Sequence, residues 1–299
     1  MDNVKEPALA VLTEDAAAVE CFLGKLYTDG GRCDRALDES AAYSLMAGGK
    51  RVRPALVMEF CRLYGGDAEA AIPFAAALEM INTFSLIHDD LPCMDDDDMR
   101  RGRPTNHKVF GEAIALLAGD ALVIDAFGVA AGNNHVSYEA RVEAVRLLSQ
   151  AAGGAGMVRG QVMDMFGEEN RLDEDELTLL HARKTGALIR VAAQLGCLAA
   201  GCDPEGEEMA TACAYAEKIG LAFQIVDDVL DATSTAEALG KSVGGDAAHG
   251  KNTFLSFYSV EDAEAYARRL TDEAITEISG KDGSERLCAL AAYLAVRQA

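Results

Sequence analysis

Two acidic stretches decide how this chain folds: Asp89-Asp90-Leu91-Pro92-Cys93-Met94-Asp95 and Asp227-Asp228-Val229-Leu230-Asp231. Each follows an apolar run with helical spacing. Carboxylates beside so much apolar sequence are costly unless cations neutralise them. Clustered carboxylates are hard oxygen ligands for Mg²⁺, an ion that proteins usually share with substrate phosphates. The two stretches therefore predict two carboxylate walls of one pocket, in which several Mg²⁺ ions hold a diphosphate.

The sequence around these stretches has the pattern of consecutive helices. Trp is absent and Pro is scarce, which favours helix over sheet. Before the first stretch, Phe74, Leu78 and Ile81 recur at helical spacing, and Ser85 and Asp89 continue the same stripe. Alternating strand patterns are lacking. We therefore predict an all-α fold, with helices over residues 13–27, 34–47, 52–64, 68–88, 111–131, 138–153, 156–166, 174–201, 206–232, 260–279 and 284–296.

Composition excludes several classes of protein. The formal net charge is −22 at pH 7. This charge argues against nucleic acid or an anionic membrane as the main partner, because both attract basic surfaces. The 8 Cys form no CxxC pair and no zinc-ligand spacing, which fits a reducing compartment, and the N-terminus lacks a signal-peptide pattern. Asp120 and Asp125 interrupt the apolar run 113–131, so we predict a buried helix there. We expect a cytoplasmic protein without stable membrane insertion.

The second acidic stretch has the clearer geometry. On a helix, Gln224, Asp227, Asp228 and Asp231 share one face, because they are spaced at i, i+3, i+4 and i+7. Like charges at these spacings repel, so an isolated helix would not favour the pattern. A bound cation removes the repulsion. The alternative interpretation is a helix end that is simply solvated.

The first acidic stretch is denser and harder to place. Pro92 removes a backbone donor and clashes with the preceding turn, so helical arithmetic cannot put Asp95 on the face of Asp89. Three further acids follow, and then Arg100 and Arg101. This segment is either a surface ion-pair network or a site where acids hold metal and arginines hold phosphate oxygens.

Three more basic motifs lie along the chain, each weak evidence by itself. Residues 48–54 (GGKRVRP) put two glycines before Lys50 and Arg53 at a helix start, where backbone N–H groups can bind an anion. Residues 181–186 (HARKTG) carry Lys184 and Thr185 within a helix. The loop 232–252 carries Lys241, Asp246 and Lys251. In so acidic a chain, basic motifs flanking two acidic stretches indicate a binding site.

These motifs together resemble a known family. The chain contains, in order, GGKRVRP, SLIHDDLPCMDDDDMRRGRPTNH, GDAL, HARKTGAL, GLAFQIVDDVLD, GK and GKNTF. This order and spacing resemble those of the head-to-tail trans-prenyl diphosphate synthases, which make farnesyl or geranylgeranyl diphosphate. The resemblance implies one polyprenyl synthase domain over residues 1–299. It also implies a helical bundle around a deep apolar cavity, and a homodimer.

The resemblance also implies roles for individual residues. Asp89 and Asp95, supported by Asp90, would bind two Mg²⁺ ions, and Asp227 would bind a third with help from Asp228 and Asp231; Mn²⁺ is a candidate substitute. The allylic diphosphate would ionise to a carbocation, the alkene of isopentenyl diphosphate would attack it, and a proton would leave to the pyrophosphate. The residues implied for the allylic diphosphate are Arg100, Lys184, Gln224 and Lys241, and those for isopentenyl diphosphate are Lys50, Arg53 and Arg101. Thr185 and Gln224 would direct oxygen dipoles at the carbocation, and Lys251 would add to the substrate site.

Some positions bear on substrate and product. Phe84 and Ser85 would line the pocket for the growing chain, and an aromatic residue at Phe84 favours farnesyl over geranylgeranyl diphosphate. Asn82 stands where the family often has His, and Arg159 and Ser242 also depart from its pattern. The alternatives are a terpene cyclase, a regulatory synthase subunit and an acidic cation-binding protein. A cyclase lacks the second diphosphate site, a regulatory subunit generally loses one acidic stretch, and a cation-binding protein leaves the basic motifs unexplained.

Overall fold

The computed structural model describes residues 2–27, 35–233 and 252–296. Lys241, Ser242, Asp246 and Lys251 lie outside the described residues. The elements are α1 (Asp2–Leu23), α2 (Arg35–Leu45), α3 (Val52–Leu63), α4 (Ala68–Asp89), β1 (Met99–Arg100), β2 (Arg103–Pro104), α5 (Asn106–Phe110), α6 (Glu112–Ala131), α7 (Tyr138–Ala152), α8 (Met157–Glu169), α9 (Glu174–His181), a π-helical segment (Ala182–Gly186), α10 (Ala187–Ala199), α11 (Glu207–Thr233), a 3-10 turn (Phe254–Ser256), α14 (Val260–Ile278) and α15 (Glu285–Val296).

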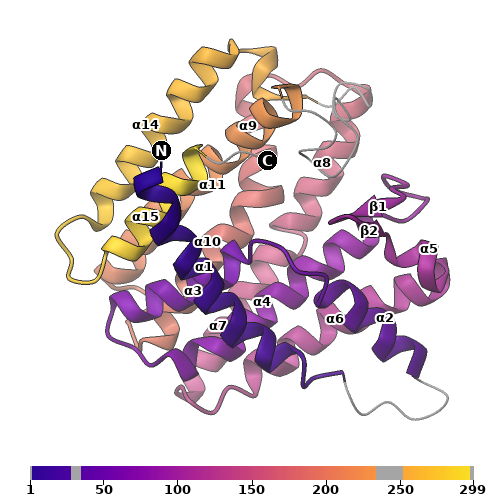
Figure 1. Cartoon of the computed structure of the whole chain (residues 1–299), viewed down its shortest axis with the longest axis horizontal. Coiled ribbons are helices and arrows are strands. Elements are labelled where there is room, and N and C mark those ends of the chain that lie inside the picture. The colour runs from indigo at the N-terminus through magenta and orange to yellow at the C-terminus, as the bar shows by residue number, and fades with distance from the viewer. Residues whose placement is uncertain (1, 28–34, 234–251, 297–299) are drawn as a thin grey trace.

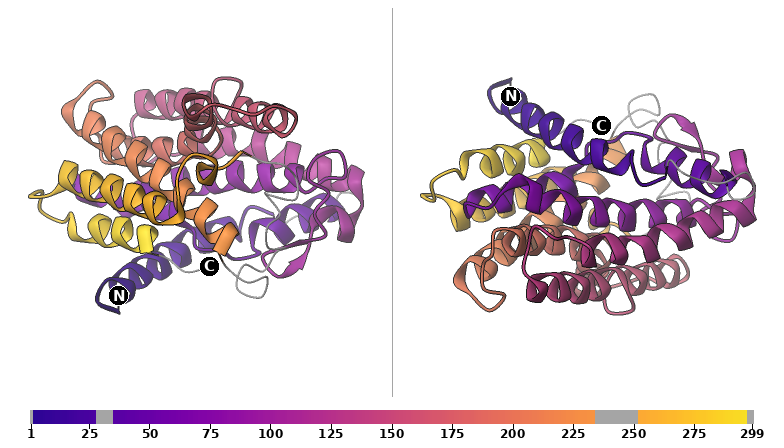
Figure 2. Two further views of the ribbon diagram at one scale, coloured as in Figure 1. Left: turned by 90° about the horizontal axis from the view of Figure 1, so that it is seen from above. Right: turned by 90° about the horizontal axis from the view of Figure 1, so that it is seen from below.

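Helix α4 lies in the middle of the bundle. It is apolar all round and packs against α3, α6 and α10 (Figures 1 and 2), as expected for a helix with no solvent face. Its N-terminus is capped by Asp67, whose side chain accepts a hydrogen bond of 3.0 Å from the Glu69 N–H. It ends at Asp89, three residues before Pro92. The first acidic stretch is therefore held at the end of a largely buried helix.

The all-α prediction is confirmed, with local differences. Helix α1 begins at Asp2 rather than at residue 13, and Pro7 lies within it. The single helix expected over 174–201 is divided by the π-helical segment Ala182–Gly186. A short antiparallel hairpin, β1 with β2, also forms where no strand was expected. Its turn residues Arg101 and Gly102 have φ values of 52° and 72°, the left-handed conformation that a type I′ hairpin turn requires at both positions.

Helix α6 does not have the fully buried environment that the sequence predicted. Its small residues, such as Ala115, Gly119 and Ala126, face the core, but Leu117 and Ile124 are 54% and 69% exposed. By length and hydropathy, α4 and α6 are the two described helices that could cross a membrane. Of the most apolar 18-residue stretch in each helix, 78% is buried in the fold for α4 but only 33% for α6. The prediction was wrong because α6 is apolar on both faces, and a uniform apolar pattern does not specify which face meets the core.

Candidate active site

The first acidic stretch folds back on itself after α4. Asp89 is the last helical residue and Asp90 caps the helix. The Asp95 N–H donates a hydrogen bond of 2.9 Å to the Asp89 carbonyl, and the Met94 N–H donates one of 2.8 Å to the Leu91 carbonyl. These bonds bring Asp95 back beside Asp89, although the two residues are six positions apart. The negative end of the α4 dipole adds to the negative potential here, so the site favours cations.

Asp90 has a different environment from Asp89. It is 2% exposed, and its Oδ1 accepts a hydrogen bond of 2.6 Å from Nε of Arg100, whose Nη2 lies at the same distance in an ion pair. Burial raises the pKa of Asp90 to about 6, although Arg100 acts in the opposite direction. Arg100 also contacts Asp97, at 3.5 Å. Asp90 thus positions the guanidinium of Arg100, while Asp89 lines the cavity described below.

The arginine hairpin and the glycine-rich loop meet at this end of the bundle. Arg101 donates a hydrogen bond to the Gly48 carbonyl, and its Nη2 lies 3.8 Å from a carboxylate oxygen of Glu79. A Cβ atom at Gly49 would lie 2.9 Å from the Arg101 guanidinium carbon and would displace it, and the Gly49 φ of 116° also favours glycine. Two motifs about fifty positions apart in the sequence are therefore brought into contact.

Within the glycine-rich loop, Arg51 has a structural role. It is 3% exposed, forms an ion pair with Glu79, and donates hydrogen bonds of 3.0 Å to Glu20 and 2.6 Å to the Leu45 carbonyl. Its φ of 47° costs roughly 1–2 kcal/mol for a residue with a side chain. With Arg51 directed into the core, Lys50 is exposed and Arg53 lines the cavity. Helix α3 begins at Val52, as the sequence predicted, so Lys50 lies just before the helix and Arg53 in its first turn.

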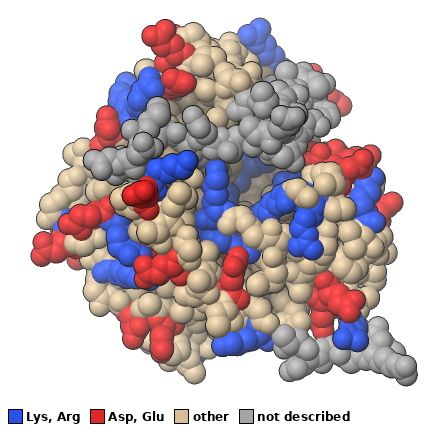
Figure 3. Space-filling model, in the orientation of Figure 1, with Lys and Arg blue, Asp and Glu red and all other residues tan. Residues whose placement is uncertain are grey.

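A cavity of about 420 Å³ lies between α4, α8 and the π-helical segment. It brings together seven of the residues selected from the sequence. Apolar side chains of α8, such as Met157 and Val162, form much of the opposite wall. In Figure 3, Lys and Arg side chains gather around a hollow in the middle of the displayed face. The seven residues are Arg53, Asn82, Phe84, Ser85, Asp89, Lys184 and Thr185.

Two glycines let neighbouring helices approach the π-helical segment closely. A Cβ atom at Gly160 of α8 would lie 2.3 Å from the Lys184 backbone nitrogen, and one at Gly220 of α11 would lie 3.2 Å from the Gly186 Cα. The Lys184 ammonium pairs with the Asp164 carboxylate of α8. The segment that supplies Lys184 and Thr185 to the cavity is therefore held from both sides.

The second acidic stretch joins the cavity through a series of hydrogen bonds. Thr185 Oγ1 donates to Gln224 Oε1 at 3.1 Å, and Gln224 Nε2 donates to Asp228 Oδ1 at 3.0 Å. The other Asp228 oxygen accepts from the Phe254 N–H at 2.8 Å. The predicted shared face of Gln224 and Asp228 is thus present. Asp228 and Asp231 are buried, whereas Asp227, one turn beyond Gln224, is partly exposed.

Some residues at the site were not selected from the sequence. His88 and Gln161 line the cavity, and Asp164 pairs with Lys184. Gln161 and Asp164 lie one turn apart on α8, so helical spacing could have identified them as one polar face. Their proximity to Lys184 is a long-range contact that spacing does not show.

His181 provides a pH-dependent probe of this region. It is 7% exposed and stacks on Phe254 with ring centroids 5.3 Å apart, and burial lowers its pKa to about 4. Between about pH 6.5 and 4 the unfolded chain would bind a proton at His181 and the folded chain would not, so this contribution to stability is lost as pH falls. Relative to a His181→Phe variant, we expect the unfolding free energy to fall by about 2 kcal/mol from pH 7.5 to pH 5. Urea unfolding of both proteins measures this, and an identical pH dependence would contradict it.

Comparison with known proteins identifies the family. The polyprenyl synthetase model matches residues 34–291. The chain is 45% identical over 267 residues to geranylgeranyl pyrophosphate synthase 7, chloroplastic, of Arabidopsis thaliana, covering 88% of this chain and 76% of that protein. It is 45% identical over 241 residues to farnesyl diphosphate synthase of Bacillus subtilis (strain 168), covering 80% and 81%. A geranyltransferase from Helicobacter pylori, solved in complex with magnesium and isoprenyl diphosphate, superposes with a TM-score of 0.86 at 31% identity, covering 96% and 97%.

A helical bundle whose cavity combines the Asp89 carboxylate, basic side chains and an apolar wall, together with these relatives, identifies a prenyltransferase. The chain belongs to the polyprenyl synthetase family. The resemblance seen in the motifs and the all-α fold are both confirmed. The relatives include a farnesyl and a geranylgeranyl diphosphate synthase, the two products considered from the sequence.

Proposed function

We propose that this protein condenses isopentenyl diphosphate with dimethylallyl and geranyl diphosphate to make farnesyl diphosphate, with geranylgeranyl diphosphate as the alternative product. The observation that carries the proposal is the single cavity that presents Asp89, Arg53 and Lys184 together with the apolar ring of Phe84. Incubation with both classes of diphosphate and Mg²⁺, followed by mass analysis, tests it. A fifteen-carbon diphosphate is expected. A cyclic hydrocarbon would instead identify a terpene cyclase, and no product would favour a regulatory subunit.

We infer that Mg²⁺ ions bind between the acidic stretches and the diphosphate. Within the described residues, no group of three or more His, Cys, Asp or Glu is arranged to hold a metal by itself. Mg²⁺ is usually bound by one or two carboxylates plus substrate phosphates, and the adjacent Asp89 and Asp95 offer suitable oxygen donors. With Asp90 in support they would hold two ions, and Asp227 and Asp231 a third. Mn²⁺ has similar ligand preferences and is a candidate substitute.

We assign separate groups of basic residues to the two diphosphates. Arg100, which Asp90 already positions, and Lys184 would hold the allylic diphosphate together with Gln224 and Lys241. Lys50, Arg53 and Arg101 lie around the glycine-rich loop and would hold isopentenyl diphosphate, with Asn82 donating a hydrogen bond from the cavity wall. Lys251 would add a further cation. When the leaving pyrophosphate develops charge, fixed cations and bound metal stabilise it electrostatically.

The allylic carbocation also needs a protected environment. The Thr185 hydroxyl and the Gln224 amide are fixed by their mutual hydrogen bond and by Asp228, so their oxygen dipoles are oriented before substrate binds. The apolar wall excludes water that would quench the cation. The departed pyrophosphate would accept the proton that is lost after condensation.

Replacing Phe84 by alanine is expected to lengthen the product. The Phe84 ring is 8% exposed, lines the cavity and packs edge-on against His88 with centroids 5.7 Å apart. His88 in turn donates from Nε2 to the Leu116 carbonyl at 3.0 Å and fills the space beside Gly119. A ring supported in this way cannot move aside cheaply. Phe84→Ala should shift the products towards twenty carbons or more with a modest loss of rate, as measured by mass analysis.

A matched control for this prediction is Phe257→Ala. Phe257 is 37% exposed and does not line the cavity, so its loss should leave the product distribution unchanged. An unchanged distribution in a folded, active Phe84→Ala enzyme would show that another residue limits the chain length.

We also propose that the protein is a cytoplasmic homodimer of one polyprenyl synthase domain over residues 1–299, without stable membrane insertion or a nucleic-acid partner. The exposed apolar face of α6, with Leu117 and Ile124, supports the dimer, because such a face is costly in water. The double substitution Leu117→Glu/Ile124→Glu is expected to halve the mass measured by sedimentation. An unchanged mass would place any interface elsewhere.

A further inference from the structure

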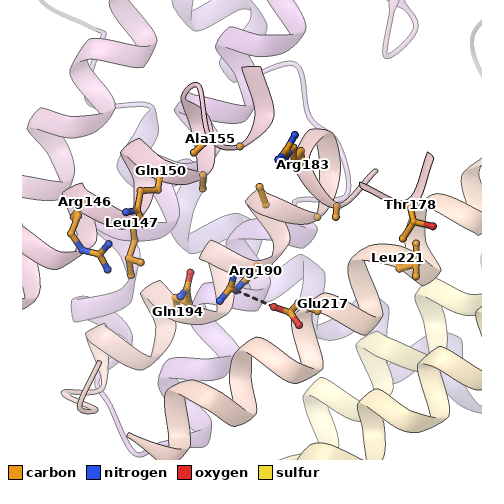
Figure 4. A pocket seen from close by; sticks show the side chains of 15 residues that line it. Arg146, Leu147, Gln150, Ala155, Thr178, Arg183, Arg190, Gln194, Glu217 and Leu221 are labelled. Atoms are coloured by element: carbon orange, nitrogen blue, oxygen red, sulfur yellow. Dashed lines mark ion pairs between the residues drawn. The ribbon is translucent and has the colours of Figure 1, made fainter. Parts of the chain in front are cut away.

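A second cavity, larger than the catalytic one, lies between α7, α10, α11 and the π-helical segment (Figure 4). Its volume is about 660 Å³, against about 420 Å³ for the catalytic cavity. Small-molecule sites in proteins typically enclose about 300–1,000 Å³. None of the residues assigned above to the substrates or metals lines it.

The lining of this second cavity combines an apolar surface with positive charge. Leu147, Leu221 and several alanines supply the apolar part. Arg146, Arg183 and Arg190 supply three guanidinium groups, against the single carboxylate of Glu217. Since the whole chain carries a net charge of −22, a cavity with this balance is unusual for the protein. Its chemistry is complementary to an anion that carries an apolar body.

Two of the three arginines, Arg183 and Arg190, are available to such an anion. Arg190 pairs with Glu217 at 3.3 Å, but both side chains are half exposed or more, and exposed pairs of this kind contribute at most about 1 kcal/mol. Arg146 is held by a bidentate pair with Glu143 and adds positive charge at the edge of the cavity. Arg183 donates to the Met163 sulfur at 3.4 Å, a weak acceptor, and has no carboxylate partner in the described part of the chain. A phosphate group would offer each guanidinium a stronger, charge-assisted bond.

The two cavities share one wall. Lys184 and Thr185 of the π-helical segment line the catalytic cavity, whereas Ala182, Arg183 and Gly186 of the same segment line the second. A ligand that attracts the Arg183 guanidinium therefore acts on the backbone that positions Lys184. Because Gly160 and Gly220 hold this backbone closely, a displacement on one side is transmitted to the other.

We propose that the second cavity is a regulatory site for a soluble amphipathic anion, a hydrocarbon chain ending in a phosphate or diphosphate, and that its occupation lowers catalytic turnover. The chain lies on Leu147 and Leu221, and the phosphate is bound by Arg183 and Arg190. The site differs from the catalytic cavity in having no acidic stretch, so it binds the anion without a metal.

Octyl phosphate is a suitable probe for the second cavity. The catalytic cavity of the full-length protein is first filled with Mg²⁺ and a non-reactive allylic diphosphate analogue. Octyl phosphate is then titrated into this filled enzyme, and binding is measured by calorimetry. This filling step rests on the proposed function and is measured in its own titration, so its failure counts against that proposal and not against the second site. We expect octyl phosphate to bind the filled enzyme at one site per chain, and octanol and inorganic phosphate to bind at least tenfold more weakly. Loss of octyl phosphate binding once the catalytic cavity is filled would overturn the second site.

Variants locate the binding. Arg183→Gln/Arg190→Gln is expected to weaken octyl phosphate at least tenfold, whereas Arg268→Gln, on the exposed face of α14, should leave it unchanged. Equal affinity in the double variant and the wild type would overturn the assignment. Sedimentation with phosphatidylglycerol vesicles that depends on the same two arginines would overturn a soluble ligand in favour of a membrane lipid.

Turnover tests the coupling between the cavities. At saturating substrates, octyl phosphate should lower kcat at least twofold in the wild type but not in Arg190→Gln, whose kcat without the probe should be unchanged. A kcat that does not respond to a bound probe would overturn the regulatory role.

Discussion

Replacing Asp227 or Asp89 by alanine is expected to lower kcat roughly 10³-fold or more, because in the proposed mechanism each change removes an oxygen ligand from a metal ion that neutralises the leaving diphosphate. The two residues lie on different helices, α11 and α4, so both substitutions should give the same phenotype although they are far apart in the sequence. The measurement is the steady-state rate with isopentenyl and allylic diphosphates at saturating Mg²⁺, with circular dichroism to show that each variant is folded.

The matched control is Asp272→Ala, an exposed position on α14, which should retain wild-type activity. Chelation by EDTA should abolish turnover in the wild type, and added Mg²⁺ should restore it. Near-normal turnover in EDTA would refute the metal-dependent mechanism for the whole site.

The second large effect is expected from Arg53→Ala, and it should be selective for one substrate. Charge-assisted hydrogen bonds contribute about 1.5–3 kcal/mol each, so the KM for isopentenyl diphosphate should rise roughly 10–100-fold. The KM for the allylic diphosphate should change much less, because Arg100 and Lys184 are assigned to that substrate. Initial rates with each substrate varied in turn separate the two constants.

Selectivity is the test of this assignment, since Arg53 and Lys184 line one cavity. Arg53→Lys should recover part of the affinity, because it keeps the charge but loses the bidentate geometry. Arg269→Ala, at an exposed position on α14, serves as the neutral control. An equal rise in both KM values would show that Arg53 does not distinguish the two diphosphates.

The sequence was sufficient where local periodicity determines the structure. Its apolar pattern predicted α4 and the position of Asp89, and spacing alone placed Gln224 and Asp228 in contact. It did not place Asp95, because the chain after Pro92 is not helical. The backbone there is held by hydrogen bonds to the Asp89 and Leu91 carbonyls, which helical spacing does not predict.

Long-range contacts account for most of what spacing could not predict. In GGKRVRP the three basic residues look equivalent, yet Arg51 is buried because Glu79 and Glu20 surround it. The exposed face of α6 was missed because apolar character does not reveal whether a helix meets its own core or water. The family resemblance supplied the cavity and the roles, which the residues alone left open.

The π-helical segment Ala182–Gly186 gives the chain an unusual sensitivity to length at one position. A π turn contains one more residue than an α turn, and each residue of an α-helix rotates the following side chains by about 100°. Deletion of a single residue here would convert the π turn into a regular α turn, and α9 and α10 would keep nearly the same faces towards the core because only the extra residue is removed. The side chains within the segment would be redistributed, so Lys184 and Thr185 could not both keep their places in the cavity wall. A deletion that makes the local helical geometry more regular would therefore disturb the cavity wall, so the π turn is needed for the present lining of the cavity and not for helix stability.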